Sequence, residues 1–342
     1  PESGEWTMKK VAHKDLVEKH YGRTGRSPRT EGAPAGAPFC RLDANPLYHG
    51  AIMAKASEHT IFDAVRDASA GPVEPVRLKE TDTFCFHCRP EVACWNVCCH
   101  GADVTLTPYD ILRLTSRLEL EAADFLARFT APAIWGPAGL PVAKLRMEGI
   151  EGEGPCPFMV EAGCTVYQDR PATCRYYPLG FGSFKTKDAD AVDDFFFLVK
   201  EGHCTGHAEA KTQSVAEFHH EQGLADYDRL NRGWIDVLMK MASWKTMGGP
   251  GGEDVSQQTK QMFFLVSTDI DGFRRFVFET KFLESYDIDD EVIERLRHDD
   301  EALLQLGFDW LKSVMFREST LSLRPDVLQE SIARARDDMG AS

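Results

Sequence analysis

The cysteines are the residues of this sequence whose type and spacing could do chemistry. Ten are present, at positions 40, 85, 88, 94, 98, 99, 156, 164, 174 and 204. Four of them form the compact segment Cys88-x5-Cys94-x3-Cys98-Cys99. Thiolates are soft ligands that select zinc, copper(I) or iron–sulfur clusters. In a long chain with no apolar signal-peptide core at its start, such clustering indicates metal ligation more often than disulfide bonds.

The spacing favours iron–sulfur over zinc. Structural zinc sites usually contain tidy Cys-x2–4-Cys pairs, and only Cys85 and Cys88 form one here. The other spacings are irregular, and ligands from distant points of a chain suit a bulkier cluster. Adjacent cysteines usually point in different directions, so Cys98 and Cys99 can serve two irons or two clusters. A strained disulfide between these two is an alternative, but it leaves the other cysteines unexplained.

Three strings carry a resemblance to a known family: CWNVCCHGADVTLTPYDILRL, CPFMVEAGCTVYQDRPATCRYYPL and HCTG. They resemble the YkgJ-type zinc- or iron-chelating cysteine-cluster family, from about Phe84 to about Phe316. The resemblance assigns eight metal ligands, Cys88, Cys94, Cys98, Cys99, Cys156, Cys164, Cys174 and Cys204. Relatives similar to flagellin lysine methylase are associated with a [4Fe–4S] cluster. The resemblance therefore implies an iron–sulfur cluster, with Zn2+ as the alternative, and a redox or methyl-transfer role.

Other side chains near these cysteines are secondary candidates. Cys85 lies outside the family pattern and is either a ninth ligand or a bystander, and Cys40 is expected to be an ordinary thiol. Two arginines flank Cys174 and either offset the charge of bound thiolates or pair with acids. Three histidines next to cysteines are expected to donate hydrogen bonds rather than to ligate. These are Arg170 and Arg175, and His87, His100 and His203. Trp95, Tyr176 and Tyr177 are expected to shield the site from water.

Catalytic motifs are absent from the sequence, so no catalytic residue is assigned. The Cys-x3-Cys-x2-Cys triplet of radical S-adenosylmethionine enzymes and the ferredoxin cysteine run are both missing. The glycine-rich segment 179–183 matches no nucleotide fingerprint and is predicted to be a turn. Three classes stay open: a metalloenzyme, a cluster protein that carries electrons or docks on a partner, and a zinc-stapled interaction module.

The composition limits the partners. The chain has 342 residues, 43% of them hydrophobic, and a net charge of −15. Such an acidic chain repels phosphate backbones, which disfavours nucleic acid as a partner. Its longest apolar runs fall far short of the roughly 20 residues that span a bilayer. We expect a cytoplasmic protein, and a protein partner or homodimer is open because a Gly/Pro-rich arm needs a surface on which to order.

The elements expected around the cysteines give a helix-rich α+β fold. Thr107, Pro108 and Asp110 are typical of a capped helix start. Short strands are predicted at 142–147, 165–167 and 195–200, the last two in one small sheet. Amphipathic periodicity predicts a helix through Tyr227, Trp234 and Met241, and further helices after 253. One of these is expected to run from Phe273 to Leu283.

Three regions follow from this pattern. Residues 1–80 are expected to form a peripheral arm with a linker at 22–38 and short helices at 14–20 and 51–68. Residues 81–247 are expected to form the cysteine-cluster domain. The run of glycines at 248–252 is the clearest linker, and residues 253–342 follow as a helical C-terminal part.

Overall fold

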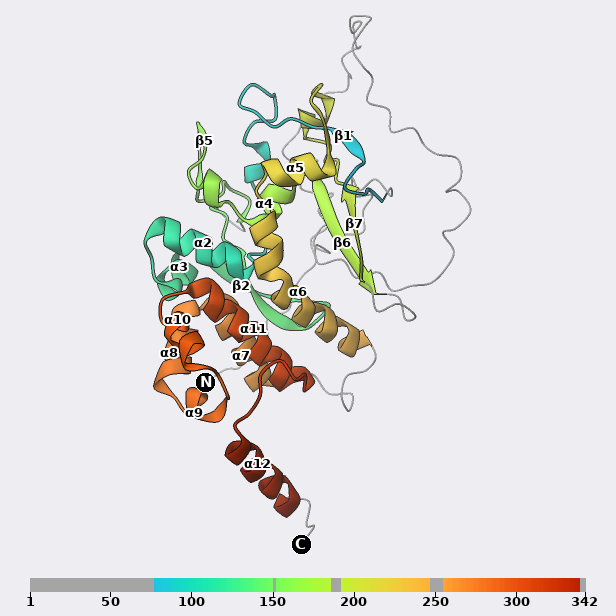
Figure 1. Ribbon diagram of the computed structural model, residues 1–342. Coiled ribbons are helices and arrows are strands. Elements are labelled where there is room, and N and C mark those ends of the chain that lie inside the picture. The colour runs from blue at the N-terminus through green and yellow to red at the C-terminus, as the bar shows by residue number, and fades with distance from the viewer. Residues whose placement is uncertain (1–76, 150–151, 186–191, 247–254, 339–342) are drawn as a thin grey trace, which may run out of the picture. The chain divides into compact units, whose positions relative to one another are not determined.

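The computed structural model describes residues 77–149, 152–185, 192–246 and 255–338 (Figure 1). All of them belong to one compact unit of the chain. The helices and the linker predicted between residues 14 and 68 lie outside these residues, as does the glycine run at 248–252. Within the described ranges, no helix is both long and apolar enough to cross a membrane.

Helices make up most of the fold. The α-helices are α2 (Pro108–Leu118), α3 (Ala122–Phe129), α4 (Ala172–Tyr176), α5 (Val215–Glu221), α6 (Ala225–Thr246), α7 (Gln257–Thr268), α8 (Ile270–Glu279), α9 (Phe282–Ser285), α10 (Asp290–Leu296), α11 (Asp300–Phe316) and α12 (Pro325–Asp338). Short 3-10 helices are η3 (Val97–Cys99), η5 (Tyr167–Asp169) and η6 (Thr205–Ala208).

Strands occur in antiparallel pairs. They are β1 (Thr83–Cys85) with β8 (Thr212–Ser214), β2 (Thr130–Trp135) with β3 (Leu140–Leu145), β4 (Met159–Val160) with β5 (Gly163–Cys164), and β6 (Leu179–Lys185) with β7 (Val192–Leu198). The predicted fold class, helix-rich α+β with a few short strands and a helical C-terminal part, is confirmed.

The glycine-rich segment predicted to be a turn is instead strand β6. Its register places Gly180 opposite Phe197 and Gly182 opposite Phe195 on β7. A Cβ atom on either glycine would lie 2.2 or 2.5 Å from a ring carbon of the facing phenylalanine. Because the two glycines have no side chains, the phenylalanine rings pack directly over the backbone of β6. The prediction of a turn was therefore wrong.

Two further predictions of elements need correction. Residues 165–167 do not form a strand, because the chain leaves β5 at Cys164 and turns into η5. The strand near 195–200 exists as β7, but it pairs with β6 rather than with that segment. The helix expected from Phe273 to Leu283 ends at Glu279, and α9 begins separately at Phe282.

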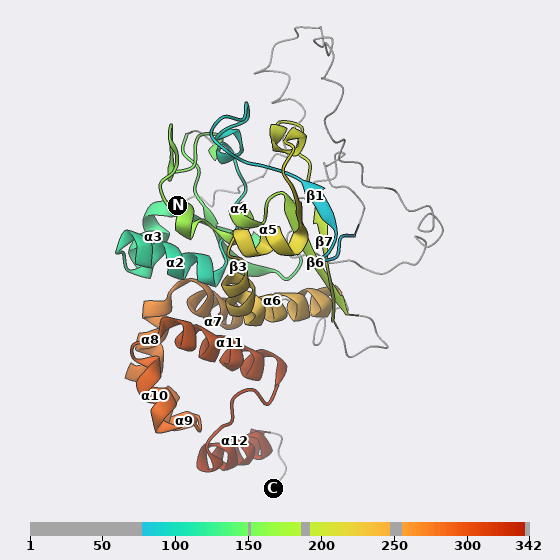
Figure 2. The ribbon, with the colours of Figure 1, turned by 45° about the horizontal axis from the view of Figure 1, so that its top comes forward.

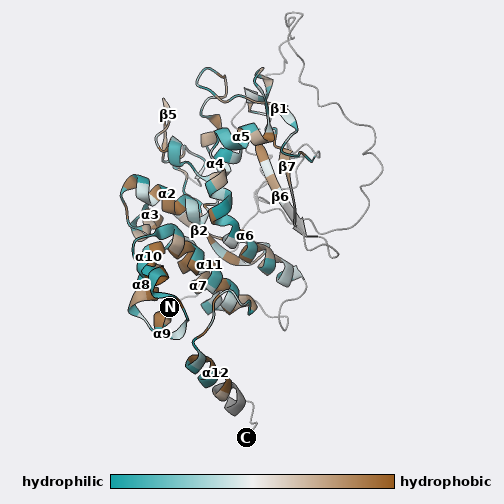
Figure 3. Ribbon diagram, in the orientation of Figure 1, coloured by the Kyte–Doolittle hydropathy of each residue, from teal (hydrophilic) through white to brown (hydrophobic). Residues whose placement is uncertain are grey.

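The largest hydrophobic cluster joins the C-terminal helices to β3 and α6. Phe263 on α7, Phe273 on α8 and Phe308 on α11 are fully buried with Trp234 and Leu238 of α6. Figures 1 and 2 both show α6, α7 and α11 side by side, and hydrophobic residues recur along α11 in Figure 3. This cluster packs the C-terminal helices against β3 and α6.

Two smaller clusters lie under the cysteine-bearing segments. One gathers Phe84, Phe86 and Phe218 with residues of β6 and β7, and half-buried Cys204 packs against it. The other gathers Leu114, Phe125 and Phe158, with Cys156 and Cys164 at its edge. Leu78, which was assigned to the peripheral arm, is 3% exposed and belongs to the first of these clusters. Three of the eight cysteines therefore pack against hydrophobic clusters.

Candidate metal centre

Eight cysteines of the described residues are free thiols, and they are the eight that the family pattern assigns. They come from five places: the loop 88–94, η3, the loop and hairpin 156–164, α4 and the start of η6. Cys88, Cys98 and Cys174 are exposed, whereas the other five are half-buried. Hydrogen bonds between segments gather these thiols into two sets, and Cys98 links the sets as an electrostatic neighbour of both Cys99 and Cys174.

Thiol set A consists of Cys88, Cys94, Cys98 and Cys204. The Cys94 sulfur accepts two hydrogen bonds from Thr205, one from the backbone N–H and one from the hydroxyl, both 3.2 Å long. Thr205 follows Cys204, so these bonds bring the two cysteines together across more than a hundred positions. The N–H of His87 donates to the Gly206 carbonyl at 3.0 Å, which places Cys88 beside the same segment.

Thiol set B consists of Cys99, Cys156, Cys164 and Cys174. The Cys156 N–H donates to the Cys99 carbonyl at 2.7 Å, and the Gly101 N–H donates to the Gly154 carbonyl at 3.0 Å. In the hairpin, Met159 pairs with Cys164 across β4 and β5 and donates its N–H to the Cys156 carbonyl at 2.9 Å. The Cys174 thiol has Cys156 and Cys164 among its electrostatic neighbours, and also Cys98 of set A.

Burial and mutual proximity raise the pKa of most of these thiols. Burial, followed by Cys98, Cys94 and Cys204, raises the pKa of Cys88 to about 11. Contact with the Cys99 thiol and then burial raise the pKa of Cys98, and burial raises those of Cys156, Cys164, Cys174 and Cys204. These thiols therefore stay neutral without metal, and a bound cation would favour their thiolate forms.

Cys94 differs from the other thiols. Burial acts to raise its pKa, but the hydrogen bonds from Thr205 and the backbone outweigh this and lower the pKa. Donors to a sulfur favour its thiolate form. Sequence reasoning missed Thr205, because no signal in the sequence joins residue 205 to residue 94.

Helix α2 fixes the helix that carries Cys174. The predicted capping box is confirmed, because Thr107 and Asp110 exchange hydrogen bonds of 3.1 and 2.8 Å. The second carboxylate oxygen of Asp110 accepts the Ala172 N–H at 2.8 Å, at the first residue of α4. Burial raises the pKa of this fully buried carboxyl to about 6, although the hydrogen bonds from Thr107 and Ala172 act to lower it. Asp110 thus positions Cys174 from a distant segment.

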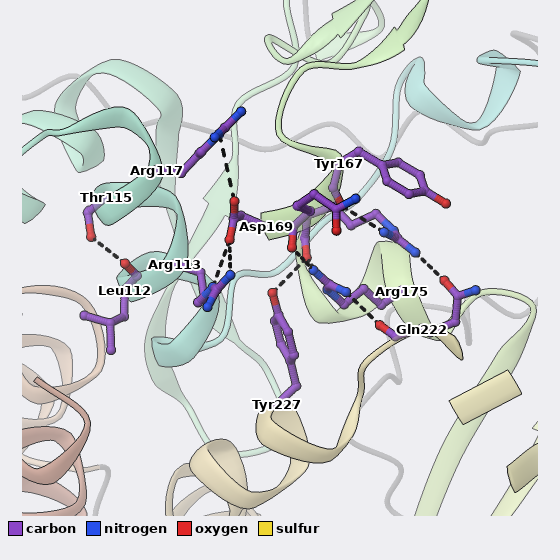
Figure 4. A network of polar contacts seen from close by, with 11 residues as sticks. Leu112, Arg113, Thr115, Arg117, Tyr167, Asp169, Arg175, Gln222 and Tyr227 are labelled. Carbon is purple, nitrogen blue, oxygen red and sulfur yellow. Dashed lines mark hydrogen bonds and ion pairs between the residues drawn. The ribbon is translucent and has the colours of Figure 1, made fainter. Parts of the chain in front are cut away.

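The two arginines that flank Cys174 are both buried and have different roles. Arg175 donates to the carbonyls of Gln168, Arg170 and Gln222 and so holds the chain together before α4 (Figure 4). Arg170 donates to the Tyr167 carbonyl and the Gln222 side chain. Among the described residues neither forms a salt bridge with an acid. The positive charge of Arg170 partly opposes the rise in the pKa of Cys88 and Cys164, so it acts on a thiol of each set.

The nearby carboxylate of Asp169 forms ion pairs with arginines of α2 instead. Arg113 and Arg117 of α2 converge on the Asp169 carboxylate, with Arg117 at 3.9 Å (Figure 4). These three side chains line a cleft of about 560 Å3 that α2 shares with the start of α11. None of the eight thiols lines this cleft, so the thiols and the cleft are separate features.

The remaining candidates have partners of their own. Cys85 is disulfide-bonded, and its sulfur lies 3.3 Å from the Thr212 hydroxyl, so it does not offer a thiolate. His100 lies 3.2 Å from the Asn96 carbonyl, and His203 lies 3.4 Å from the Glu201 carboxylate. His87 is half-buried. Cys40 lies outside the described residues.

The aromatic side chains predicted to shield the site fall in different places. Trp95 packs against Gly163, and Tyr176 donates to Asp228 away from the thiols. The Tyr177 hydroxyl is buried beside Cys204 and finds no hydrogen-bond partner of good geometry in the described ranges. A thiolate at Cys204 would accept a hydrogen bond from this hydroxyl, so Tyr177 fits a metal-bound cysteine better than a neutral thiol.

A ready-made site for a single metal ion is not present in the described residues: no three His, Cys, Asp or Glu side chains are grouped closely enough to hold one. The donor set itself is of the type that a thiophilic metal prefers, because it offers eight free thiols, several of which are electrostatic neighbours. Free thiols of this kind suit zinc or iron–sulfur ligation.

Comparison with known proteins agrees with this donor set. Residues 87–218 match the family model CxxCxxCC, described as "Putative zinc- or iron-chelating domain". No curated protein and no solved structure matches the chain. The match begins just before Cys88 and ends beyond Cys204, so it contains all eight free thiols. Residues 87–218 are thus similar to the putative zinc- or iron-chelating domain of the cysteine-cluster family that the sequence resembles.

Proposed function

We propose that this protein is an iron–sulfur protein of the [4Fe–4S] type, whose cluster ligands are drawn from the eight free thiols. The observation that carries the proposal is the donor set, which consists of sulfur alone. Of the histidines beside cysteines, His100 lies next to the Asn96 carbonyl and His203 next to the Glu201 carboxylate. A site without nitrogen or oxygen ligands favours iron–sulfur clusters or zinc over harder metals.

Two features favour iron–sulfur over zinc. The ligands come from segments that are far apart in the chain, whereas structural zinc sites are usually built from two compact knuckles. Donors also surround the sulfurs, with Thr205 on Cys94 and Tyr177 beside Cys204. Hydrogen bonds to cluster sulfurs and nearby positive charge, here Arg170, set the reduction potential of iron–sulfur clusters.

The cluster would supply one-electron chemistry when bound. The chain's own residues would hold it through their thiolates, provide hydrogen bonds to the sulfurs and place the buried Arg170 charge nearby. We therefore propose a redox role and keep cysteine-bound zinc, with a purely structural or interaction role, as the alternative. Methyl transfer remains an implication of the family resemblance alone.

The visible spectrum of protein purified without oxygen tests the proposal. Iron–thiolate charge transfer gives broad absorption near about 400 nm, and dithionite should bleach it. Electron paramagnetic resonance of the reduced protein should give a signal that is lost in Cys94→Ser. A colourless protein that contains zinc and no iron would replace the proposal by its alternative.

A further inference from the structure

The cleft between α2 and the start of α11 has walls of opposite charge. We propose that it binds a small dipolar ligand with the chemistry of an amino acid or a short peptide, by a carboxylate at one end and an ammonium group at the other. Its volume of about 560 Å3 is typical of small-molecule sites. None of the eight thiols lines the cleft, so this inference does not depend on the proposed function.

Helix α2 provides the basic wall. Arg113 and Arg117 are one helical turn apart, so they lie on the same face of α2, and both point toward Asp169 (Figure 4). Arg113 donates from its Nε to the Asp169 carboxylate at 2.9 Å, whereas the Nε of Arg117 stays 3.9 Å away. Two guanidinium groups thus face one carboxylate, which leaves one positive charge in excess on this wall.

Arg117 carries this excess charge. Its contact with Asp169 is too long for a hydrogen bond, and it makes no other ion pair or hydrogen bond in the part of the chain that the structure describes. Its side chain is 55% exposed. The planar fork of N–H donors can therefore engage both oxygens of a bound carboxylate, which is the geometry in which arginine binds carboxylates most strongly.

The start of α11 provides the acidic wall, because residues 299–301 are all acidic and all line the cleft. Asp299 caps the helix by accepting the Ala302 N–H at 2.9 Å, and Asp300 forms an ion pair with Arg274. The helix N-terminus adds only about half a positive charge. Three carboxylates therefore outweigh the positive charge that Arg274 and the helix supply.

Glu301 offers the carboxylate that a ligand can reach. Among the described residues, its ion pair is with Arg229, at 3.5 Å, and Arg229 lies closer to Asp226, at 2.9 Å. The Glu301 side chain is 46% exposed. A bound ammonium group can therefore approach this carboxylate without breaking a short ion pair.

Tyr109 of α2 lies between the two walls and also lines the cleft. Burial raises the pKa of its hydroxyl, Arg113 acts to lower it, and Glu301 acts to raise it, so charges of both walls reach this one side chain. A dipolar ligand would pair with both walls at once. A molecule with a single charge would pair with one wall and meet a like charge on the other.

Triglycine is a suitable probe, because it is a zwitterion with its charges at opposite ends. Isothermal titration calorimetry of the full chain, purified without oxygen, should detect its binding. N-acetyl-triglycine lacks the ammonium group, and triglycine amide lacks the carboxylate. Each should bind about 10- to 100-fold more weakly than triglycine, as expected when one charged hydrogen-bonding group is lost.

Two variants assign the ends of the ligand to the walls. Arg117→Ala should weaken triglycine binding about 10- to 100-fold without weakening the binding of triglycine amide. Glu301→Gln should weaken triglycine binding without weakening that of N-acetyl-triglycine. Arg128→Ala and Glu294→Gln are the matched controls, because neither residue lines the cleft, and both should bind triglycine like wild type.

Three results would overturn the proposal. One is the absence of triglycine binding at millimolar concentration, and another is equal binding of the three molecules by the wild-type chain. The third is a loss of triglycine affinity in the control variants as large as that in Arg117→Ala. If the cleft variants do not fold, as circular dichroism would show, the comparison of the three molecules on the wild-type chain still decides.

Discussion

Replacing Gly163 by alanine should separate the two loops that carry most of the thiols. Gly163 precedes Cys164, is buried, and has φ +122°, a conformation that L side chains rarely adopt. A Cβ at this position would lie 3.0 Å from the ring of Trp95, which follows Cys94. The same interface is closed by the Asn96 side chain, which donates to the Val160 and Glu161 carbonyls at 3.1 and 3.2 Å.

The expected cost follows from these contacts. A non-glycine residue in a sparsely populated φ region costs about 1–3 kcal/mol. The reduced entropy of the unfolded chain returns roughly 0.4–1 kcal/mol to a Gly→Ala variant. We therefore expect Gly163→Ala to lower the free energy of unfolding by about 1–2 kcal/mol, before any displacement of Trp95 is added. Displacement of Trp95 should also weaken metal retention.

Gly202→Ala is the matched control, because it lies two residues before Cys204 and no heavy atom stands within 4 Å of its Cβ position. Urea unfolding followed by circular dichroism, with and without bound metal, measures the first effect. Metal content after a fixed exposure to a chelator measures the second. The reasoning is refuted if Gly163→Ala unfolds at the same urea concentration as Gly202→Ala and keeps as much metal.

Four further predictions concern the thiols. Removal of metal by a chelator should destabilise the fold by several kcal/mol, since structural thiolate sites contribute on the order of ten, and urea unfolding of the stripped protein checks this. In metal-free protein at pH 7.5, iodoacetamide should modify Cys94 first, because its pKa is lowered, and Cys88 only as the pH approaches about 11, as peptide mass spectrometry can follow. Arg170→Gln should weaken metal affinity about 10- to 100-fold in chelator competition and Arg170→Lys less, because the buried charge reaches both thiol sets. Cys174→Ser should give metal-depleted or insoluble protein, and equal metal content in wild type and this variant would argue against a ligand role.

Local signals in the sequence predicted the parts of the fold that depend on neighbours in the chain. The capping box at Thr107 and Asp110 and the apolar stripe of α6 occur where they were expected, because both are set by residues within one or two helical turns. Strand β6 was missed because its glycines are poor strand formers on their own. Their place in a strand depends on Phe195 and Phe197, which lie on another segment.

The candidate ligands could be predicted from cysteine spacing, but their division into sets could not. That division depends on contacts between segments that are far apart, such as the bond from Thr205 to Cys94 across 111 positions and the bond from Cys156 to Cys99. The link from Asp110 to the start of α4 is likewise invisible in sequence, although Asp110 itself was identified as a capping residue. The spacing of the cysteines in the sequence identifies the candidate ligands, whereas only the folded structure shows which of the segments that carry them are in contact.

Iron, sulfide and zinc analysis of protein purified without oxygen is the measurement that tests the central claim most directly. The proposed function predicts iron and acid-labile sulfide in equal amounts, with little zinc, and a Cys94→Ser variant in which both fall together. Protein that contains neither iron nor zinc above the level of the Cys94→Ser variant would contradict the claim that these thiols form a metal centre.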